Sequence, residues 1–407
     1  MFRAILVSIC LMLSTVAVGD ASLELKLEKI IEIYGLNPCR QVEPDALSGL
    51  GKKFFASKEL SGNRDTSCET CHIEDKGFAD GLSIAVGVGG DGESTQRLAD
   101  GNGVLVQRNA FTLFERGNPS FLNFFWDSKI ESDSSNIYSP FGDQVSNKFN
   151  SALAVASILP LTERDEFLGK NNLFSENEIR QSVGDKLYQD KYDALSKSIS
   201  SRVWSSPELS SAALDAGLSK EDFELADVGN ALAEFITSEF SCPRSKWQDF
   251  LRGDKEALTP SQKTGAITFF GAARCASCHT PPLFSDFKHH SIGVPQGAFG
   301  PHTRTRDIGR AAVTNSPEDI YLFRTPPLIS VSKTAPYGHN GIFPTLESVI
   351  LHHVNPVTFF IDNPNYSREN DLLRLGRYLD SRSSRLKFIE INSLEDLSSI
   401  IDFMETL

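Results

Sequence analysis

Two short stretches of the chain, Cys68-Glu69-Thr70-Cys71-His72 and Cys275-Ala276-Ser277-Cys278-His279, repeat one C-x-x-C-H pattern. Two cysteines three residues apart lie on one side of a helical turn, so both thiols can react with the two vinyl groups of one porphyrin. The histidine that follows then directs its imidazole at the iron. Each stretch therefore predicts a covalent haem c, with His72 and His279 as iron ligands. A redox-active or zinc-binding C-x-x-C pair is the alternative.

The first 19 residues are typical of a secretory signal peptide. Arg3 precedes an apolar run over residues 4–18, and small residues follow at Ala17, Gly19 and Ala21. The run is short for a membrane span, and an uncleaved anchor is the alternative. We therefore expect residues 1–19 to be removed and the protein to be exported to the periplasm, where haem c is attached.

Length and charge exclude several classes of protein. The 407 residues are 40% hydrophobic and 23% charged, which fits a globular protein of two or three domains. The formal net charge is -13 and the sequence has no basic run. Because such a surface repels phosphate backbones, we expect no nucleic-acid partner.

Two cysteines remain outside the signal peptide and the C-x-x-C-H stretches, Cys39 and Cys242. In an oxidising compartment two surplus cysteines most simply pair, so we expect a disulfide between them. Two buried free thiols are the alternative.

The sequence around each C-x-x-C-H stretch has a similar plan. Helical patterns precede the stretches at residues 45–57 and 259–270, and Gly-rich or Pro-rich segments follow at 77–103 and 281–301. We expect neither regular helix nor strand in these two segments. Further helical patterns occupy residues 176–240, 366–381 and 393–405, and no β-hairpin or βαβ series is evident. The sequence therefore predicts a mainly α protein of two tandem cytochrome c-like domains, 20–243 and 244–407, with one haem each.

The histidines limit the second axial ligand of each iron. No histidine lies between His72 and His279, and the only methionine after residue 12 is Met404. We therefore expect the first iron to be open to a small oxidant. A histidine that reaches over from the second domain is the alternative.

The second haem has a candidate ligand on a helix expected after Thr345. One face of this helix carries residues at i, i+3, i+4 and i+7: Leu346, Val349, Ile350 and His353. His352 lies on another face, so we predict His353 as the second ligand. A core histidine bonded to a backbone carbonyl is the alternative. For the remaining histidines we expect hydrogen bonds to a haem propionate or to a loop rather than ligation of iron: His289, His290, His302 and His339.

From about residue 45 onward the chain resembles the bacterial di-haem cytochrome c peroxidase family, including its MauG-like branch. Besides the two C-x-x-C-H stretches, the resemblance rests on these segments: Leu60-Ser61-Gly62, Phe78-Ala79-Asp80-Gly81, Arg108-Asn109-Ala110, Phe125-Trp126-Asp127, residues 323–328 and residues 334–341.

The resemblance implies a calcium ion and an electron relay. Asn109 would give its side-chain oxygen to the calcium, and Thr334 and Pro336 their carbonyl oxygens, which suits a hard cation. Trp126 resembles the tryptophan that relays electrons between the haems. Simple core packing is the alternative role of Trp126.

Residues 160–167 resemble the stretch that carries the family's distal glutamate, which falls on Glu166. A carboxylate in a dry pocket can take a proton from peroxide and return it to the leaving oxygen. A surface glutamate in a charged turn is the alternative.

Three positions depart from the family pattern. Val88 stands where many peroxidases carry a displaceable histidine, and Ala156 where a distal glutamine is common. His353 stands where the second haem usually has methionine, or tyrosine in the MauG-like branch. Histidine in place of methionine should lower the reduction potential of the second haem.

The leading functional prediction is a periplasmic di-haem peroxidase. It would reduce hydrogen peroxide at the first haem with electrons that a small donor, a cytochrome c or a cupredoxin, delivers through the second haem. A MauG-like enzyme that oxidises aromatic residues of a partner protein is the runner-up, and a non-enzymatic electron carrier is the third candidate. The sequence leaves open whether the protein forms a homodimer.

Overall fold

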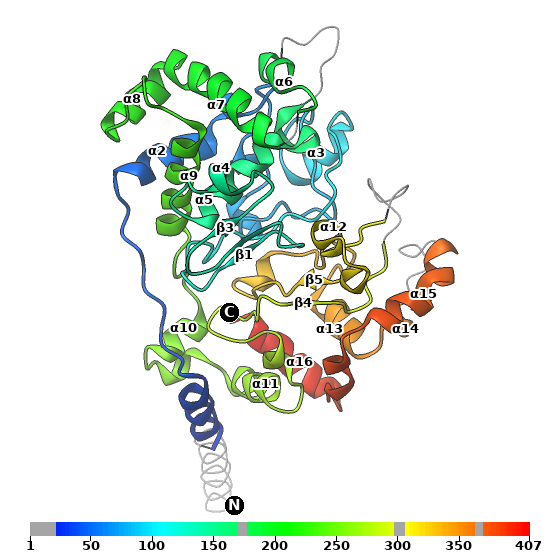
Figure 1. The fold of residues 1–407 in the computed structure, drawn as a ribbon. Coiled ribbons are helices and arrows are strands. Elements are labelled where there is room, and N and C mark those ends of the chain that lie inside the picture. The colour runs from blue at the N-terminus through cyan, green and yellow to red at the C-terminus, as the bar shows by residue number, and fades with distance from the viewer. Residues whose placement is uncertain (1–21, 170–176, 187, 297–305, 363–368) are drawn as a thin grey trace, which may run out of the picture.

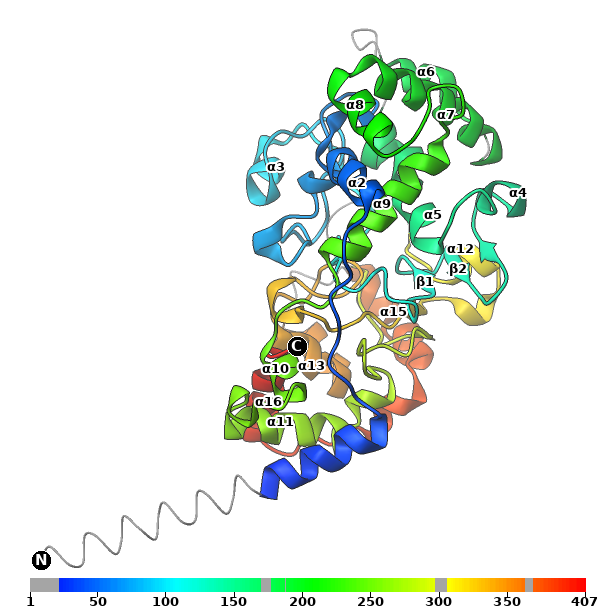
Figure 2. The same cartoon turned by 90° about the vertical axis from the view of Figure 1, so that its left-hand side faces the viewer.

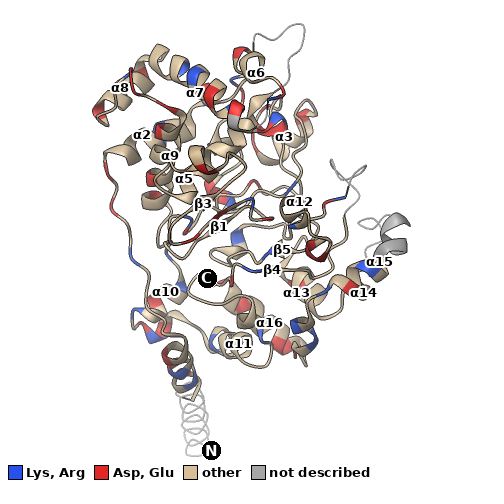
Figure 3. Ribbon diagram, viewed as in Figure 1, with Lys and Arg blue, Asp and Glu red and all other residues tan. Residues whose placement is uncertain are grey.

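The structure is a computed structural model that describes residues 22–169, 177–186, 188–296, 306–362 and 369–407 (Figure 1). The expected signal peptide and His302 lie outside these residues. Among the described helices, none combines the length and the apolar character that a membrane span requires. Acidic and basic residues are interspersed over the ribbon (Figure 3).

The first half of the fold is built from helices α2 to α9 (Figure 1). Their bounds are α2 (Ala46–Ala56), α3 (Ser94–Asp100), α4 (Asp143–Ser146), α5 (Ala152–Ile158), α6 (Glu178–Val183), α7 (Tyr188–Ser205), α8 (Pro207–Asp215) and α9 (Leu225–Glu239). A short antiparallel sheet in the order β1-β2-β3 lies at the edge of this half: β1 (Asn123–Phe124), β2 (Ile130–Ser132) and β3 (Ile137–Tyr138).

Among its described residues, the second half contains helices α10 to α16 and the antiparallel strands β4 and β5. The helices are α10 (Lys246–Leu251), α11 (Pro260–Phe270), α12 (Ala311–Thr314), α13 (Leu346–Val354), α14 (Pro356–Asp362), α15 (Glu369–Ser381) and α16 (Leu394–Met404). The strands are β4 (His289–His290) and β5 (Phe323–Arg324).

In each half, a glycine allows two helices to pack closely. Gly51 lets α2 cross α9 closely, because a Cβ at this position would overlap with the carbonyl oxygen of Ala231. Gly265 does the same for α11 against α16, where a Cβ would overlap with the carbonyl oxygen of Ser399. The helices predicted before the two C-x-x-C-H stretches are thus confirmed as α2 and α11, and each packs against a later helix of its own half.

The expectation of no regular structure after the first C-x-x-C-H stretch is wrong, because α3 forms within residues 77–103. It has only seven residues and ends at Gly101, whose backbone is left-handed, so the surrounding glycines hid it. Two-residue β4 likewise lies in the segment after the second stretch, and the β2–β3 hairpin was missed. Strands of two or three residues are too short to show an alternating pattern.

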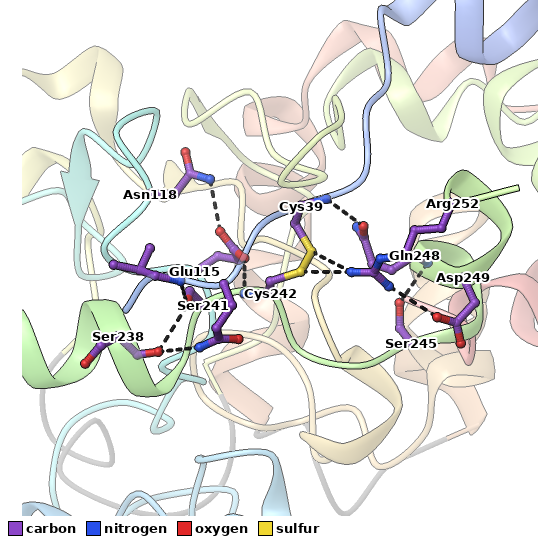
Figure 4. The surroundings of a disulfide bond; sticks show 12 residues. Cys39, Glu115, Asn118, Ser238, Ser241, Cys242, Ser245, Gln248, Asp249 and Arg252 are labelled. Carbon is purple, nitrogen blue, oxygen red and sulfur yellow. Dashed lines mark hydrogen bonds and ion pairs between the residues drawn. A yellow bond between two sulfur atoms is a disulfide. The ribbon is translucent and has the colours of Figure 1, made fainter. Parts of the chain in front are cut away.

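The N-terminal segment joins the two halves. A helix over residues 22–34 packs on the second half (Figure 2), where Leu27 and Leu36 belong to the buried core. The chain then runs to α2 in the first half. Midway, Cys39 forms a disulfide with Cys242, and their Cα atoms are 5.3 Å apart (Figure 4). The predicted disulfide is confirmed, and the free-thiol alternative is wrong.

Candidate functional site

The two C-x-x-C-H stretches adopt the same local structure. Each begins a 3₁₀ turn, η2 (Cys68–Thr70) or η7 (Cys275–Ser277), and the histidine N–H donates back to the carbonyl of the first cysteine, over 3.0 Å in the first stretch and 2.8 Å in the second. The spacing therefore brings two thiols and one imidazole together at each turn.

Each histidine of these stretches is held by a backbone carbonyl. His72 places Nδ1 2.7 Å from the carbonyl oxygen of Phe78, and His279 places Nδ1 3.0 Å from that of Phe284. Burial lowers the pKa of both imidazoles to about 4, so they are neutral at physiological pH. A neutral imidazole that donates through Nδ1 leaves Nε2 available to a metal.

A cavity of about 230 Å³ lies at the first turn. Its walls include Cys68, Cys71 and His72 together with Ala156 and Glu166. His72 is the sole histidine among the described residues that line it, and methionine is absent from the same set. The carboxyl group predicted as the distal acid-base group thus lies in the cavity of the first C-x-x-C-H stretch.

Glu166 lies on η5 (Arg164–Leu168), a single π-helical turn of the kind that often occurs at functional sites. The backbone at residues 87 and 88 packs directly on this turn, and Val88 N–H donates to the Asp165 carbonyl over 3.2 Å. Gly87 permits the approach, since a Cβ there would overlap with the Asp165 carbonyl oxygen. Val88 is itself buried.

Burial raises the pKa of Glu166 to about 7, while the nearby Lys129 opposes the shift. The side chain keeps some exposure because it opens onto the cavity. A carboxyl group with this pKa exchanges its proton near neutral pH, as a general acid-base group must.

A second cavity of the same volume, about 230 Å³, lies at the second turn. Cys275, Cys278 and His279 line it, and so does His353 from α13. The Nδ1 of His353 lies 2.7 Å from the Val349 carbonyl oxygen and donates to it, which leaves Nε2 available to a metal.

His352, the neighbour of His353, faces another part of the core. It is fully buried, its Nε2 lies 3.0 Å from the Ile292 carbonyl oxygen, and its ring centroid lies 4.7 Å from that of Phe343. His352 does not appear among the described residues that line the second cavity. The structure therefore separates the two histidines as the helical phase predicts.

One segment of chain forms a wall shared by the two cavities. Its residues that line both are Asn109, Ala110, Phe111, Arg116 and Trp126. The Trp126 indole N–H donates to the Asn109 carbonyl over 3.1 Å, and the Trp126 carbonyl accepts the Arg324 N–H over 2.8 Å. The residue predicted as a relay is thus fixed between the cavities.

Comparisons with known proteins decide the family. Residues 45–256, just over half of the chain, match the model of the di-haem cytochrome c peroxidase family. The chain belongs to the di-haem cytochrome c peroxidase family.

Relatives within this family carry two kinds of name. The chain is 25% identical to cytochrome-c peroxidase IdrP2 of Denitromonas iodatirespirans, over 98% of this chain and 92% of the relative. It is 28% identical to the methylamine utilization protein MauG of Paracoccus denitrificans, over 76% of this chain and 74% of the relative. The sequence comparisons therefore include both peroxidases and MauG proteins.

Solved structures share the fold. A MauG-like protein associated with microbial copper homeostasis matches with a TM-score of 0.60 at 20% identity, over 92% of this chain and 93% of that structure. The diheme peroxidase BthA of Burkholderia thailandensis also matches with a TM-score of 0.60, at 21% identity, over 90% of this chain and 86% of that structure. The mainly helical fold expected from the sequence is confirmed at this level.

The three residues expected to bind calcium border one cavity. Asn109, Thr334 and Pro336 all line the second cavity. Asn109 donates from its amide nitrogen to the Leu82 carbonyl over 2.7 Å, so the amide oxygen points away from that bond. Nearby, the buried Asp80 accepts the Leu82 N–H over 2.9 Å with one oxygen, while its other oxygen accepts no hydrogen bond among the described residues.

Sequence analysis assigned no role to two arginines near the first cavity, Arg97 and Arg108. Arg97 is buried and donates to the carbonyls of Val86, Gly87 and Gly90, so it holds the loop that packs on η5. Arg108 bridges the two halves, with ion pairs of 2.7 Å to both Asp127 and Asp307. Only the three-dimensional structure shows that Arg97 is buried and that Arg108 is half-buried between two carboxylates, since arginine usually lies on the surface.

Proposed function

We propose that this member of the family is a di-haem c-type peroxidase that reduces hydrogen peroxide in the first cavity. The observation that carries the proposal is the position of Glu166, whose carboxyl group has a pKa of about 7 and shares a cavity with His72. Relatives named cytochrome-c peroxidase support it.

Two haem c groups fit the residues present. At each site two cysteines and one histidine line a cavity, and the histidine keeps Nε2 for the iron. When bound, each haem supplies an iron that exchanges electrons. In this proposal residues 20–243 and 244–407 form the two cytochrome c-like domains, with the helix at 22–34 packed on the second.

Glu166 acts as the general acid-base group of the reaction. Its carboxylate accepts a proton from the hydrogen peroxide that enters the cavity and returns a proton to the oxygen that departs as water. The full reaction consumes two electrons and two further protons and yields two waters. The loop at residues 86–90 and Arg97 hold the π-helical turn that orients this carboxylate.

Electrons reach the first cavity from the second. His279 and His353 line the second cavity, and two imidazole ligands would leave no open position there for peroxide. Trp126, which lines both cavities, relays the electrons in this proposal. The donor is a small periplasmic cytochrome c or cupredoxin, and the protein reaches the periplasm through the signal peptide at residues 1–19.

A calcium ion is proposed at the shared wall. Its ligands are the side-chain oxygen of Asn109 and the carbonyl oxygens of Thr334 and Pro336, which suit a hard, oxygen-seeking cation. A Cβ added at Gly77 would lie only 3.0 Å from the methyl carbon of Thr334, so the two residues are tightly packed. A calcium ion bound at Thr334 would therefore join loops of both halves.

The identity of His353 favours a second candidate, a MauG-like oxidase of aromatic residues in a partner protein. A nitrogen ligand supports oxidised iron better than a thioether does. A relative named MauG is consistent with this candidate.

Peroxide turnover of the exported protein tests the proposal. Mass spectrometry should find two haem additions, and stopped-flow absorption should show oxidation of two equivalents of a reduced cytochrome c per hydrogen peroxide. Two haems without donor oxidation, but with oxidation of aromatic residues on a partner protein, would favour the MauG-like candidate. Two haems with no response to peroxide would favour an electron carrier.

A further inference from the structure

Arg116 is a buried cation in the wall between the two cavities. Its side chain lines both of them, and the residue is only 3% exposed. The Nε group donates to the Thr112 carbonyl over 2.9 Å, but Nη1 is buried without a hydrogen-bond partner among the described residues. The guanidinium thus retains a donor that nothing in the described protein satisfies.

The charge of Arg116 is not neutralised either. Within the part of the chain that the structure describes, no carboxylate forms an ion pair with it. The adjacent Glu115 is turned away, since its carboxylate accepts the N–H of Cys242 and the amide of Asn118 (Figure 4). A buried cation without a partner is unfavourable, because burial removes its hydration and nothing replaces it.

A second cation increases this cost. Arg324 is also buried, and the two guanidinium groups lie 4.5 Å and 5.4 Å from the centroid of the same Phe121 ring. Burial, with added repulsion from Arg324, lowers the pKa of Arg116 well below its usual value. The rings of Phe111 and Phe121 hold the Arg116 guanidinium in place but carry no net negative charge.

We infer that Arg116 is a carboxylate-binding residue whose free guanidinium edge takes a haem propionate at the boundary of the two cavities. The inference rests on the proposed binding of two haems. A guanidinium pairs with a carboxylate through parallel hydrogen bonds, and such a pair would satisfy both the donor and the charge. Arg108 differs, because Asp127 and Asp307 already pair with it.

The shared position of Arg116 has a consequence for both irons. Reduction of an iron removes one positive charge, so a nearby cation favours the reduced state. Because Arg116 lines both cavities, its loss should lower both reduction potentials. Arg385 lines only the second cavity, where it is partly exposed and pairs with Asp286 over 3.5 Å, so its replacement serves as a control confined to that cavity.

Spectroelectrochemistry of the holoenzyme tests the inference with Arg116→Gln, Arg116→Lys and Arg385→Gln. In Arg116→Gln the ratio of oxidised to reduced haem at a fixed applied potential should rise roughly tenfold for both haems, which equals about 59 mV for a one-electron couple. Both potentials should also become more dependent on pH between about 5 and 7, because the cation no longer holds the propionate pKa low. Arg116→Lys should recover most of the shift, and Arg385→Gln should move the second haem alone.

The inference is overturned if Arg116→Gln leaves both ratios within about twofold of the wild-type values and their pH dependence unchanged. If the glutamine variant incorporates too little haem, Arg116→Met removes the same charge at similar length and is judged by the same criterion. Mass spectrometry separates this failure from failure of the proposed function. Two haems with unmoved potentials refute only the role of Arg116, whereas fewer than two haems in the wild type refute both.

Discussion

The first cavity contains a carboxyl group, Glu166, besides His72, and the second contains another imidazole, His353, besides His279. Both cavities start from the same five-residue pattern, and in both the motif histidine is held by a backbone carbonyl. The repeated pattern therefore accounts for the proposed attachment of a haem at each site. The residues brought in from elsewhere in the fold account for the different chemistry proposed at each site.

The backbone that carries His353 also differs from the backbone that carries Glu166. His353 belongs to α13, a regular helix with a capping box at Thr345, where helical phase alone sets its direction. Glu166 belongs to a π-helical turn that needs Gly87 beside it and Arg97 behind the adjacent loop. The proposed electron-transfer site is thus built on regular structure, and the proposed catalytic site on irregular backbone that neighbouring residues hold in place.

The largest expected effect is that of Glu166→Gln. This change keeps the shape of the side chain but removes the group that accepts a proton, so peroxide reduction should slow by about 100-fold to 10,000-fold. The absorption spectra of both haems should stay unchanged. Stopped-flow measurement of peroxide consumption checks the rate.

Asp165→Asn is the matched control, because Asp165 precedes Glu166 and pairs instead with Arg164 over 2.8 Å. It should react at close to the wild-type rate. Wild-type reactivity of Glu166→Gln would remove the carboxyl group from the mechanism.

The pH dependence of the rate should report the same carboxyl group. Glu166 must be ionised to accept the first proton, and its pKa is about 7. The rate should therefore be level above pH 7 and fall about tenfold per unit as pH drops well below that value. This fall should be absent from Glu166→Gln, and a wild-type rate independent of pH between 5 and 8 would contradict the assignment.

Replacement of His353 should make the second cavity resemble the first. His353→Ala removes one of the two imidazoles, so the second haem should change from low-spin to high-spin, as absorption and magnetic spectra report. His352→Ala should leave the spin state unchanged and instead lower the free energy of unfolding by about 1–3 kcal/mol, because it leaves the Ile292 carbonyl without its partner. The reverse pattern would transfer the ligand role to His352.

Trp126→Phe should produce a smaller effect than Glu166→Gln. The change keeps an aromatic ring in the shared wall but removes the indole N–H that bonds to the Asn109 carbonyl. Reaction of peroxide in the first cavity should persist, while oxidation of the second haem slows. Rapid-scan absorption separates the two events, and equal slowing of both would indicate a packing role for Trp126.

The sequence predicted the parts of the fold that have long or repeated patterns. The helices before the two C-x-x-C-H stretches were predicted to within one residue, because Asp45 and Thr259 cap them. The disulfide of Cys39 with Cys242 followed from counting cysteines. Helix α3 and the hairpin of β2 and β3 were missed, since elements of seven, three and two residues carry too few positions for a period to show.

The candidate site was only partly predictable. The phase of one helix was enough to separate His353 from His352, and family resemblance directed attention to Glu166 and Trp126. Nothing in the sequence indicated a role for Arg116, since its burial depends on contacts with the rings of Phe111 and Phe121. Residues that act through long-range packing leave no local pattern.

The two proposed haem sites differ in whether the protein supplies a second ligand to the iron. Low-temperature electron paramagnetic resonance of the fully oxidised, exported protein tests it directly, with both signals quantified against the haem content. We predict one high-spin signal from the first haem and one low-spin signal, with two imidazole ligands, from the second, in equal amounts. Two low-spin signals that persist on addition of peroxide would contradict the account.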